Sequence, residues 1–198
     1  MKSNLFLFLA AIVLTPALPV HAQSASWQLD PAHSSAQFAV RHMGISTVRG
    51  TFTKLSGSAR YEAEDLKNSS AEVTIETASV DSRVEMRDND LRSDHFFDVQ
   101  KYPTITFRST KVESAGTAKL KITGDLTIRG ITKSVALDVD GPSKPVDDGR
   151  GHLHMGVSAT GAINRADFGM TGYQGIVGNE ISLTIDAELV QPTTNPAK

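Results

Sequence analysis

The chain has no cysteine among its 198 residues, and it has few aromatic side chains: one tryptophan, three tyrosines and eight phenylalanines. Without thiols it can form neither a disulfide bridge nor a cysteine-linked lipid anchor, so its fold depends on the core alone. It also lacks an excess of either charge, since 20 basic residues face 22 acidic ones for a net charge of −2. Such a balance does not favour a nucleic-acid partner, and we expect none.

Long apolar runs are scarce as well, and the longest stands at the N-terminus. It extends from Leu5 to Leu14, after Lys2, and is followed by prolines and a small-x-small sequence that ends at Ala22. This order predicts a secretory signal peptide, residues 1–22, cleaved after Ala22. The alternative is a membrane anchor, but the run is shorter than the ~20 residues of a spanning helix. We therefore expect a periplasmic protein without stable membrane insertion.

The rest of the chain has the length of one domain. We expect that domain over residues 23–190. The last eight residues, QPTTNPAK, are polar and rich in proline. They predict a flexible tail over residues 191–198.

Apolar and polar residues alternate through most of the domain. In the segment 36–42, Ala36, Phe38, Val40 and His42 share one face, which should be interior. Turns at residues 43–46 and at Arg129-Gly130 predict hairpins. Further alternating segments indicate a system of antiparallel strands: residues 48–52, 71–75, 105–107, 118–122, 126–128, 135–139, 153–157 and 181–185.

Two architectures suit such a series of strands. A closed barrel has no exposed edges, whereas a two-sheet sandwich must protect its edges in another way. Interior positions mix phenylalanine with small residues such as Ala36 and Gly50, and an eight-stranded barrel has room for one small ligand. Alternatively, Gly50 marks a bulge and the interior is solidly packed.

One segment, residues 91–110, changes period in the middle. Leu91, Phe96 and Phe97 cluster among polar residues, as in short helical turns, while Ile105 and Phe107 alternate with polar residues after Pro103. Upstream, the spacing of Ser82 and Glu85 matches a capping box, with Ser82 as the helix start. We predict a short helical insert that caps one end of the barrel, either as a fixed plug or as a gate.

Several segments together resemble the YceI family. They are LDPAHSSAQFAVRHMGISTVRGTF, LRSDHFFDVQKYPTITFRST, GDLTIRGITKSVAL and NRADFG, in that order, from about Trp27 to Val190. The resemblance implies an all-β fold, an extended antiparallel lipocalin-like β-barrel with the helical insert at one end. It also implies a long apolar pocket that holds a polyisoprenoid, such as a polyprenyl quinone, in a periplasmic protein.

Candidate ligand-binding residues follow from strand parity, from the insert and, for Phe168, from the family resemblance. An apolar tail needs few directional contacts, so its site should look like a core, and each position could equally be ordinary packing. Among them, His42 could hydrogen-bond a head group or be satisfied by the backbone. The candidates are Phe38, Val40, His42, Phe52, Leu91, Phe96, Phe97, Phe107, Leu126, Ile128, Met155 and Phe168.

Other motifs give weaker support for a functional site. His152 and His154 have the i, i+2 spacing of two metal ligands, but no third ligand is evident, and we expect both to face solvent. Asp167, Phe168 and Gly169 spell a kinase triplet without its companion motifs, so they are not a kinase signal. The family resemblance instead implies structural roles, with Arg165 or Asp167 fixing a loop and Phe168 closing the barrel. We assign no catalytic residue, metal or cofactor.

The leading hypothesis is a binding or carrier protein, not an enzyme, for a polyisoprenoid or another long apolar ligand. One alternative is an enzyme acting on a lipid or quinone through His42 or the His152/His154 pair. Another is a packed β-sandwich that serves as an adhesion module. The sequence leaves a homodimer open.

Overall fold

The computed structural model describes residues 26–192, so the predicted signal peptide and residues 193–198 of the predicted tail lie outside the described part. The last strand continues to Pro192, two residues into that tail. Twelve strands are present: β1 (Ser26–Leu29), β2 (Ser35–His42), β3 (Ser46–Phe52), β4 (Leu55–Arg60), β5 (Ser70–Glu76), β6 (Val80–Asp81), β7 (Thr104–Gly116), β8 (Lys119–Ile128), β9 (Ile131–Asp140), β10 (Val146–Asp147), β11 (His152–Asn164) and β12 (Val177–Pro192).

Helical elements are short. They are the α-helix α1 (Glu85–Arg92) and the 3-10 turns η1 (Leu66–Asn68), η2 (Thr77–Ser79) and η3 (Arg165–Phe168). In residues 26–192, no helix has the length and apolar character needed to cross a membrane.

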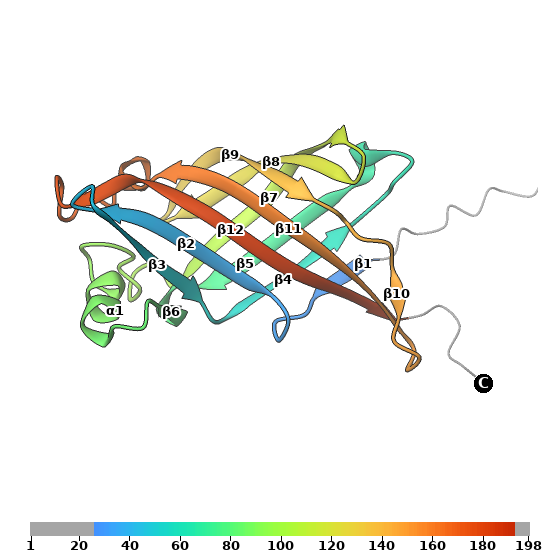
Figure 1. Ribbon diagram of the computed structural model, residues 1–198, viewed down its shortest axis with the longest axis horizontal. Coiled ribbons are helices and arrows are strands. Elements are labelled where there is room, and N and C mark those ends of the chain that lie inside the picture. The colour runs from blue at the N-terminus through green and yellow to red at the C-terminus, as the bar shows by residue number, and fades with distance from the viewer. Residues whose placement is uncertain (1–25, 193–198) are drawn as a thin grey trace, which may run out of the picture.

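Eight strands close into an antiparallel barrel, in the order β11-β9-β8-β7-β5-β4-β1-β12, and β12 pairs back with β11. This closing pair is long and regular, from His152 opposite Pro192 to Asn164 opposite Glu180. The predicted barrel is confirmed, and the packed sandwich is wrong. Figure 1 shows the barrel from the side, with the strands inclined to its long axis.

The long strand β12 connects the ring to the hairpin of β2 and β3. Its first part, from Val177 to Asp186, pairs with β2, and its later residues Leu189 and Val190 pair with β1. From β2 the sheet continues through β3 to β6. One end of the barrel therefore has β2 and β3 in its wall, and the other has β1 and β4 (Figure 1).

Both predicted hairpins are present. β2 pairs with β3 in continuous register, and β8 pairs with β9 around Arg129 and Gly130, which have φ angles of 51° and 70°. Two positive φ angles in succession are the geometry of a type I′ turn. Because Phe38 lies directly opposite Gly50 without a register shift, Gly50 is not a bulge.

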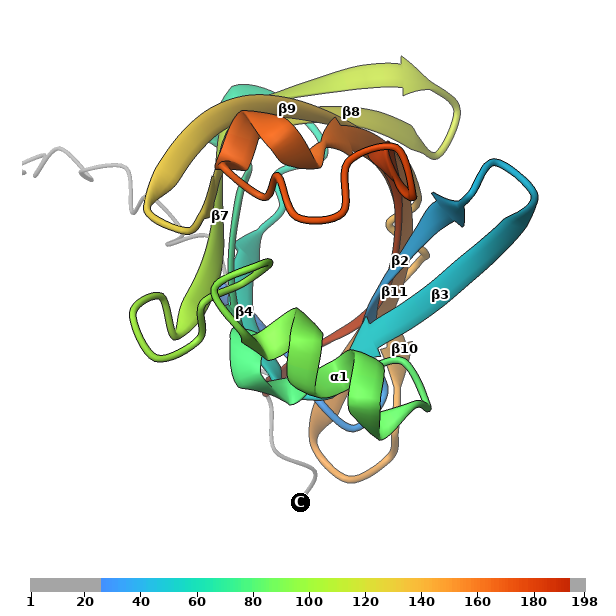
Figure 2. The same cartoon turned by 90° about the vertical axis from the view of Figure 1, so that its left-hand side faces the viewer.

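The helical insert lies at the end of the barrel where β2 and β3 meet (Figures 1 and 2). Its helix α1 begins at Glu85 with Val84 as N-cap, so the predicted start at Ser82 is wrong. Arg83, with a φ of 65°, separates Ser82 from the helix. Instead of capping α1, the Ser82 hydroxyl donates to the buried carboxylate of Asp88, which also accepts from the Ser82 N–H at 2.8 Å.

Candidate ligand-binding cavity

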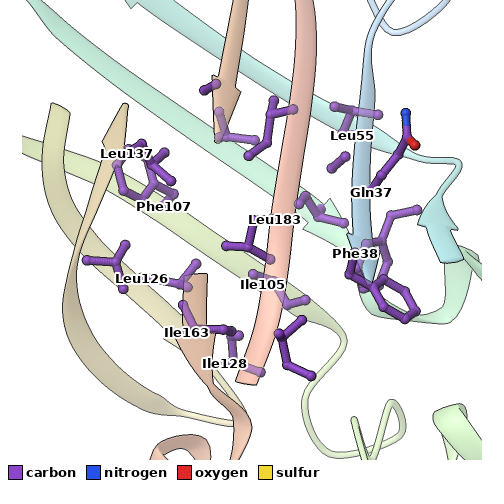
Figure 3. A pocket seen from close by; sticks show the side chains of 18 of the residues that line it. Gln37, Phe38, Leu55, Ile105, Phe107, Leu126, Ile128, Leu137, Ile163 and Leu183 are labelled. Atoms are coloured by element: carbon purple, nitrogen blue, oxygen red, sulfur yellow. The ribbon is translucent and has the colours of Figure 1, made fainter. Parts of the chain in front are cut away.

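A cavity of about 1020 Å³ lies inside the barrel. It is lined by inward side chains from every long strand, and most of them are aliphatic or aromatic. Figure 3 shows this lining, with Phe38, Phe107 and Leu126 among the side chains that point into the space. The alternation seen in the sequence places one row of each strand here, because successive side chains of a strand face opposite ways.

Nearly all the predicted site residues meet at this cavity, although they come from segments far apart in the chain. Phe168 does not line it. It is only 1% exposed and packs in a core cluster with Phe96, Ile128 and Met170. The predicted residues that line the cavity are Phe38, Val40, His42, Phe52, Leu91, Phe96, Phe97, Phe107, Leu126, Ile128 and Met155.

A row of three aromatic rings joins the barrel wall to the insert. The ring centroids of Phe38 and Phe52 are 6.0 Å apart, and Phe52 meets Phe97 edge-on at 5.4 Å. Edge-to-face contacts at such distances are favourable for aromatic pairs. The insert is thus packed on the barrel through the cavity lining itself, as the sequence predicted for Leu91, Phe96 and Phe97.

Hydrogen bonds anchor this insert at two places. The Arg92 guanidinium donates to the backbone oxygens of Ala78 at 3.0 Å and Val80 at 2.7 Å. From the β8–β9 turn, Arg129 donates to the backbone oxygens of Asp94, at 2.8 Å, and Phe96. Charge-assisted bonds of this kind are stronger than neutral ones, so the residues beside them are held in place.

Polar groups gather where the cavity reaches the surface beside α1. We call this opening the mouth. Arg87, Asp90 and Tyr173 line it, and His42 lies at the end of β2 opposite Ser46 and Val177. Asp90 accepts from His95 at 2.8 Å and from the Tyr173 hydroxyl at 3.4 Å. The mouth therefore offers polar groups to a ligand whose tail lies among apolar side chains. The opposite end of the cavity also has a polar lining, from Ser58, Arg60, Ser70 and Glu72.

Arg165 supports the wall on the other side of the mouth. It is 2% exposed, and its guanidinium donates to four backbone oxygens at 2.7–3.0 Å. Burial lowers the pKa of Arg165, because leaving water disfavours the charged form. These bonds hold the segment between β11 and β12, which confirms the predicted loop-fixing role of Arg165, whereas Asp167 is exposed. The bonded oxygens belong to Met170, Gly172, Val177 and Gly178.

The pair His152 and His154 lies outside the cavity. Asp148 is 3.3 Å from His152 and 3.5 Å from His154, and Glu188 is 2.7 Å from His154. The hydrogen bond that His154 donates to the Glu188 carboxylate raises the pKa of His154. Backbone N–H groups, with that of Arg150 foremost, lower the pKa of Asp148 to about 2. His152 is exposed as expected, whereas His154 is half-buried and its Nε2 is enclosed without a hydrogen-bond partner.

One group in the described part could hold a metal ion by its chemistry. Ligand atoms of Asp30, His33 and Glu188 lie within 4.8 Å of one another, and each of these side chains is already paired with a neighbouring opposite group. The sequence did not suggest this group, because Glu188 is far along the chain from Asp30. Antiparallel pairing at the end of β1 brings them together.

Sequence reasoning missed other parts of the cavity lining. The strand residues among them either share the parity of predicted residues in their own strand or lie in the alternating segments 135–139 and 181–185, so alternation alone could have found them. Arg87, Asp90 and Tyr173 gave no such signal, since helix and loop residues reach the mouth only through the tertiary fold. The missed strand residues include Ile105, Ile122, Val135, Leu137, Val157, Ile163, Ile181, Leu183 and Ile185.

Comparison with known proteins gives a consistent family. A model of the YceI-like domain matches residues 27–189. Among curated proteins, the chain is 36% identical over 194 residues to "Protein YceI" of Salmonella arizonae, an alignment that covers 96% of this chain and 99% of the relative.

Solved structures share the fold. BcnA of Burkholderia cenocepacia superposes with a TM-score of 0.71 at 26% identity, covering 82% of this chain and 99% of that one. A polyisoprenoid binding domain of Saccharophagus degradans, implicated in plant cell wall breakdown, gives a TM-score of 0.61 at 15% identity, with coverage of 86% and 100%. At that identity the second likeness concerns the fold alone.

Proposed function

Because the chain belongs to the YceI family, we propose that it is a non-enzymatic protein that binds one long apolar molecule of the polyisoprenoid class in its barrel cavity. The observation that carries this proposal is the apolar cavity of about 1020 Å³ inside the barrel. A hydrocarbon tail gains roughly 0.8 kcal/mol for each methylene that leaves water. The name of the Saccharophagus degradans neighbour, a polyisoprenoid binding domain, supports the same ligand class.

The ligand would lie with its tail along the barrel and its head group at the mouth. The middle of the cavity offers side chains such as Phe107, Leu126 and Leu183, which have no polar atoms to pair. At the mouth, His42 and Tyr173 present groups that can hydrogen-bond a quinone or a similar head group. The cavity thus suits an amphipathic molecule with a long tail.

The cellular role we propose is that of a carrier in the periplasm. Its support is the apolar N-terminal run followed by a small-x-small sequence, which predicts secretion. Subcellular fractionation of the organism tests this directly, and recovery of the protein in the cytoplasm would contradict it.

Extraction of the native ligand tests the binding function. The protein, purified from its own cells without added lipid, should release one apolar molecule per chain into organic solvent, identified by mass spectrometry. Leu183→Trp places a large side chain in the cavity, whereas Thr184→Trp adds the same group to the exposed face of the same strand. The first variant should lose the ligand and the second should retain it. Equal ligand content in both, or none in the wild type, would contradict the proposal.

An enzymatic role for the histidines has less support. His152 and His154 lie on the outer surface and contact carboxylates there, away from the cavity. His42 does line the cavity, and His42→Ala separates the two functions. We expect the wild type and the variant to release the same molecule, and a chemically different molecule from the wild type would support the enzyme instead.

A further inference from the structure

Exposed apolar side chains gather around the cavity mouth. In residues 26–192, eight large apolar side chains are exposed. Six of them belong to three segments at the capped end, and we call these six the rim: Met43, Ile45, Val84, Met86, Tyr173 and Ile176. The other two are Ile131, the first residue of β9, and Val146, in β10 at the far end (Figure 1).

The three segments of the rim are joined to one another. The Met43 N–H donates to the Ile176 carbonyl at 2.7 Å, which ties the β2–β3 turn to the segment before β12. Tyr173 stacks on Phe96 of the insert, with ring centroids 5.9 Å apart, and its hydroxyl reaches Asp90 of α1 at 3.4 Å. Figure 2 looks at this end, where α1, the β2–β3 hairpin and the segment before β12 surround the opening.

Part of the rim also lines the cavity. Met86 is 81% exposed, and Tyr173 and Ile176 are each close to half exposed, yet all three face the cavity as well. The apolar surface therefore continues from the outside of the protein to its interior. Exposed apolar groups arranged in this way mark an interaction surface.

We infer that the rim docks on the surface of a phospholipid bilayer, so that the ligand passes between membrane and cavity without crossing water. This inference rests on the proposed function, because a polyisoprenoid has little solubility outside membranes. The six side chains protrude from separate segments. A fluid interface can accept such separate tips, as it accepts the apolar face of a peripheral amphipathic helix.

Charge on the hairpin, unlike that on the α1 segment with its exposed Glu85 and Asp94, complements lipid phosphates. Residues 35–52 contain Arg41 and Arg49 but no aspartate or glutamate. The Arg41 guanidinium donates to the Gly44 carbonyl at 2.6 Å, which holds it next to the exposed tip formed by Met43 and Ile45. Guanidinium groups bind phosphate well.

Cosedimentation with vesicles tests the docking without any ligand. The probe is large vesicles of phosphatidylethanolamine and phosphatidylglycerol, mixed with the full protein. The test variant is Met43→Asn/Ile45→Gln, which changes two exposed residues that do not line the cavity, and asparagine tolerates the positive φ of 51° at position 43. The control is Val146→Gln, an equally apolar and exposed position at the far end, 64% exposed.

We expect the wild type and Val146→Gln to pellet with the vesicles, and the double variant to partition at least about tenfold less. Equal partition of all three proteins would overturn the inference. A wild type that stays in the supernatant would also overturn it. This holds equally if analytical ultracentrifugation shows that the wild type is a dimer and that the double variant is a monomer.

A second measurement separates this inference from the proposed function. The proteins are loaded with ubiquinone-10 from detergent micelles, where no bilayer is needed. The double variant should load like the wild type while it fails to pellet. If the wild type loads but does not bind vesicles, only the docking inference is refuted. If it binds vesicles but does not load, only the proposed ligand class is refuted.

Discussion

The ring of Phe38 fills the space above Gly50. A Cβ built on Gly50 would lie 2.4 Å from the Phe38 Cζ, which is closer than atoms can approach. The two residues are direct partners on β2 and β3, and the ring lines the cavity. The missing side chain at position 50 thus sets where an aromatic wall of the cavity lies.

Gly50→Ala should therefore push the Phe38 ring toward the cavity. We expect a loss of stability of about 1–3 kcal/mol, the usual cost of overpacking, together with lower ligand content. Urea unfolding and mass spectrometry of extracted ligand measure the two effects. Gly156→Ala is the matched control, because the nearest atom to its Cβ would be the Ala187 oxygen at 4.0 Å. Adding Phe38→Leu to Gly50→Ala should recover stability, and a failure to recover would show that the ring is not the obstacle.

Leu91→Asp and Phe97→Asp test whether the insert retains the ligand. Both side chains are buried and line the cavity, so a carboxylate there carries a large desolvation cost and should loosen the insert. We expect faster release of bound ligand, measured by transfer to acceptor vesicles. The control is Glu85→Gln on the exposed face of α1, which should not change the rate of release. Unchanged ligand retention with an intact fold would rule out a gating role and leave the insert as a plug.

Arg165→Met should unfold the segment between β11 and β12. The substitution removes four hydrogen bonds to backbone oxygens in a buried position, and we expect a loss of about 3 kcal/mol or more. Urea unfolding gives the free energy, and hydrogen exchange should rise first in residues 169–178. Arg165→Lys can restore some of these bonds and should be less destabilising. If Met and Lys variants are equally stable, the guanidinium bonds are not what holds the segment.

The titration of His154 provides a pH test. Its hydrogen bond with Glu188 raises the folded-state pKa above the ordinary value of 6.5, with a smaller effect from Asp148. A raised folded-state pKa means that this pairing stabilises the fold below pH 6.5, and that the stabilisation is lost as the pH rises through the raised pKa. NMR titration of the His154 ring should give a midpoint that falls in Glu188→Gln and falls less in Asp148→Asn. A larger fall in Asp148→Asn than in Glu188→Gln would show that Asp148, and not Glu188, is the main partner of His154.

Much of the wall was predictable because its information is local. In a strand, the parity of a residue decides which face it occupies, so Phe38, Val40 and His42 could be placed together from one heptapeptide. The same rule extended to Phe107, Leu126 and Met155. The rule does not reach Phe168, which the family resemblance suggested and which lies in the 3-10 turn η3, where alternation does not apply.

The start of the insert was misjudged for a related reason. Ser82 and Glu85 have the spacing of a capping box, but spacing does not report backbone conformation. A left-handed residue at Arg83 separates Ser82 from the helix, and its hydroxyl pairs with Asp88 instead. Conformation at one residue therefore decided between two local patterns that the sequence allowed equally.

The sequence by itself determined which side chains form strands, which of their faces is apolar, and where the helical insert interrupts them. These properties follow from periods of a few residues. Only the tertiary structure decided that the strands close into a hollow barrel, that Gly50 yields space to Phe38, and that three separate segments form the rim. Those properties depend on pairings between residues far apart in the chain, where no local pattern specifies the partner.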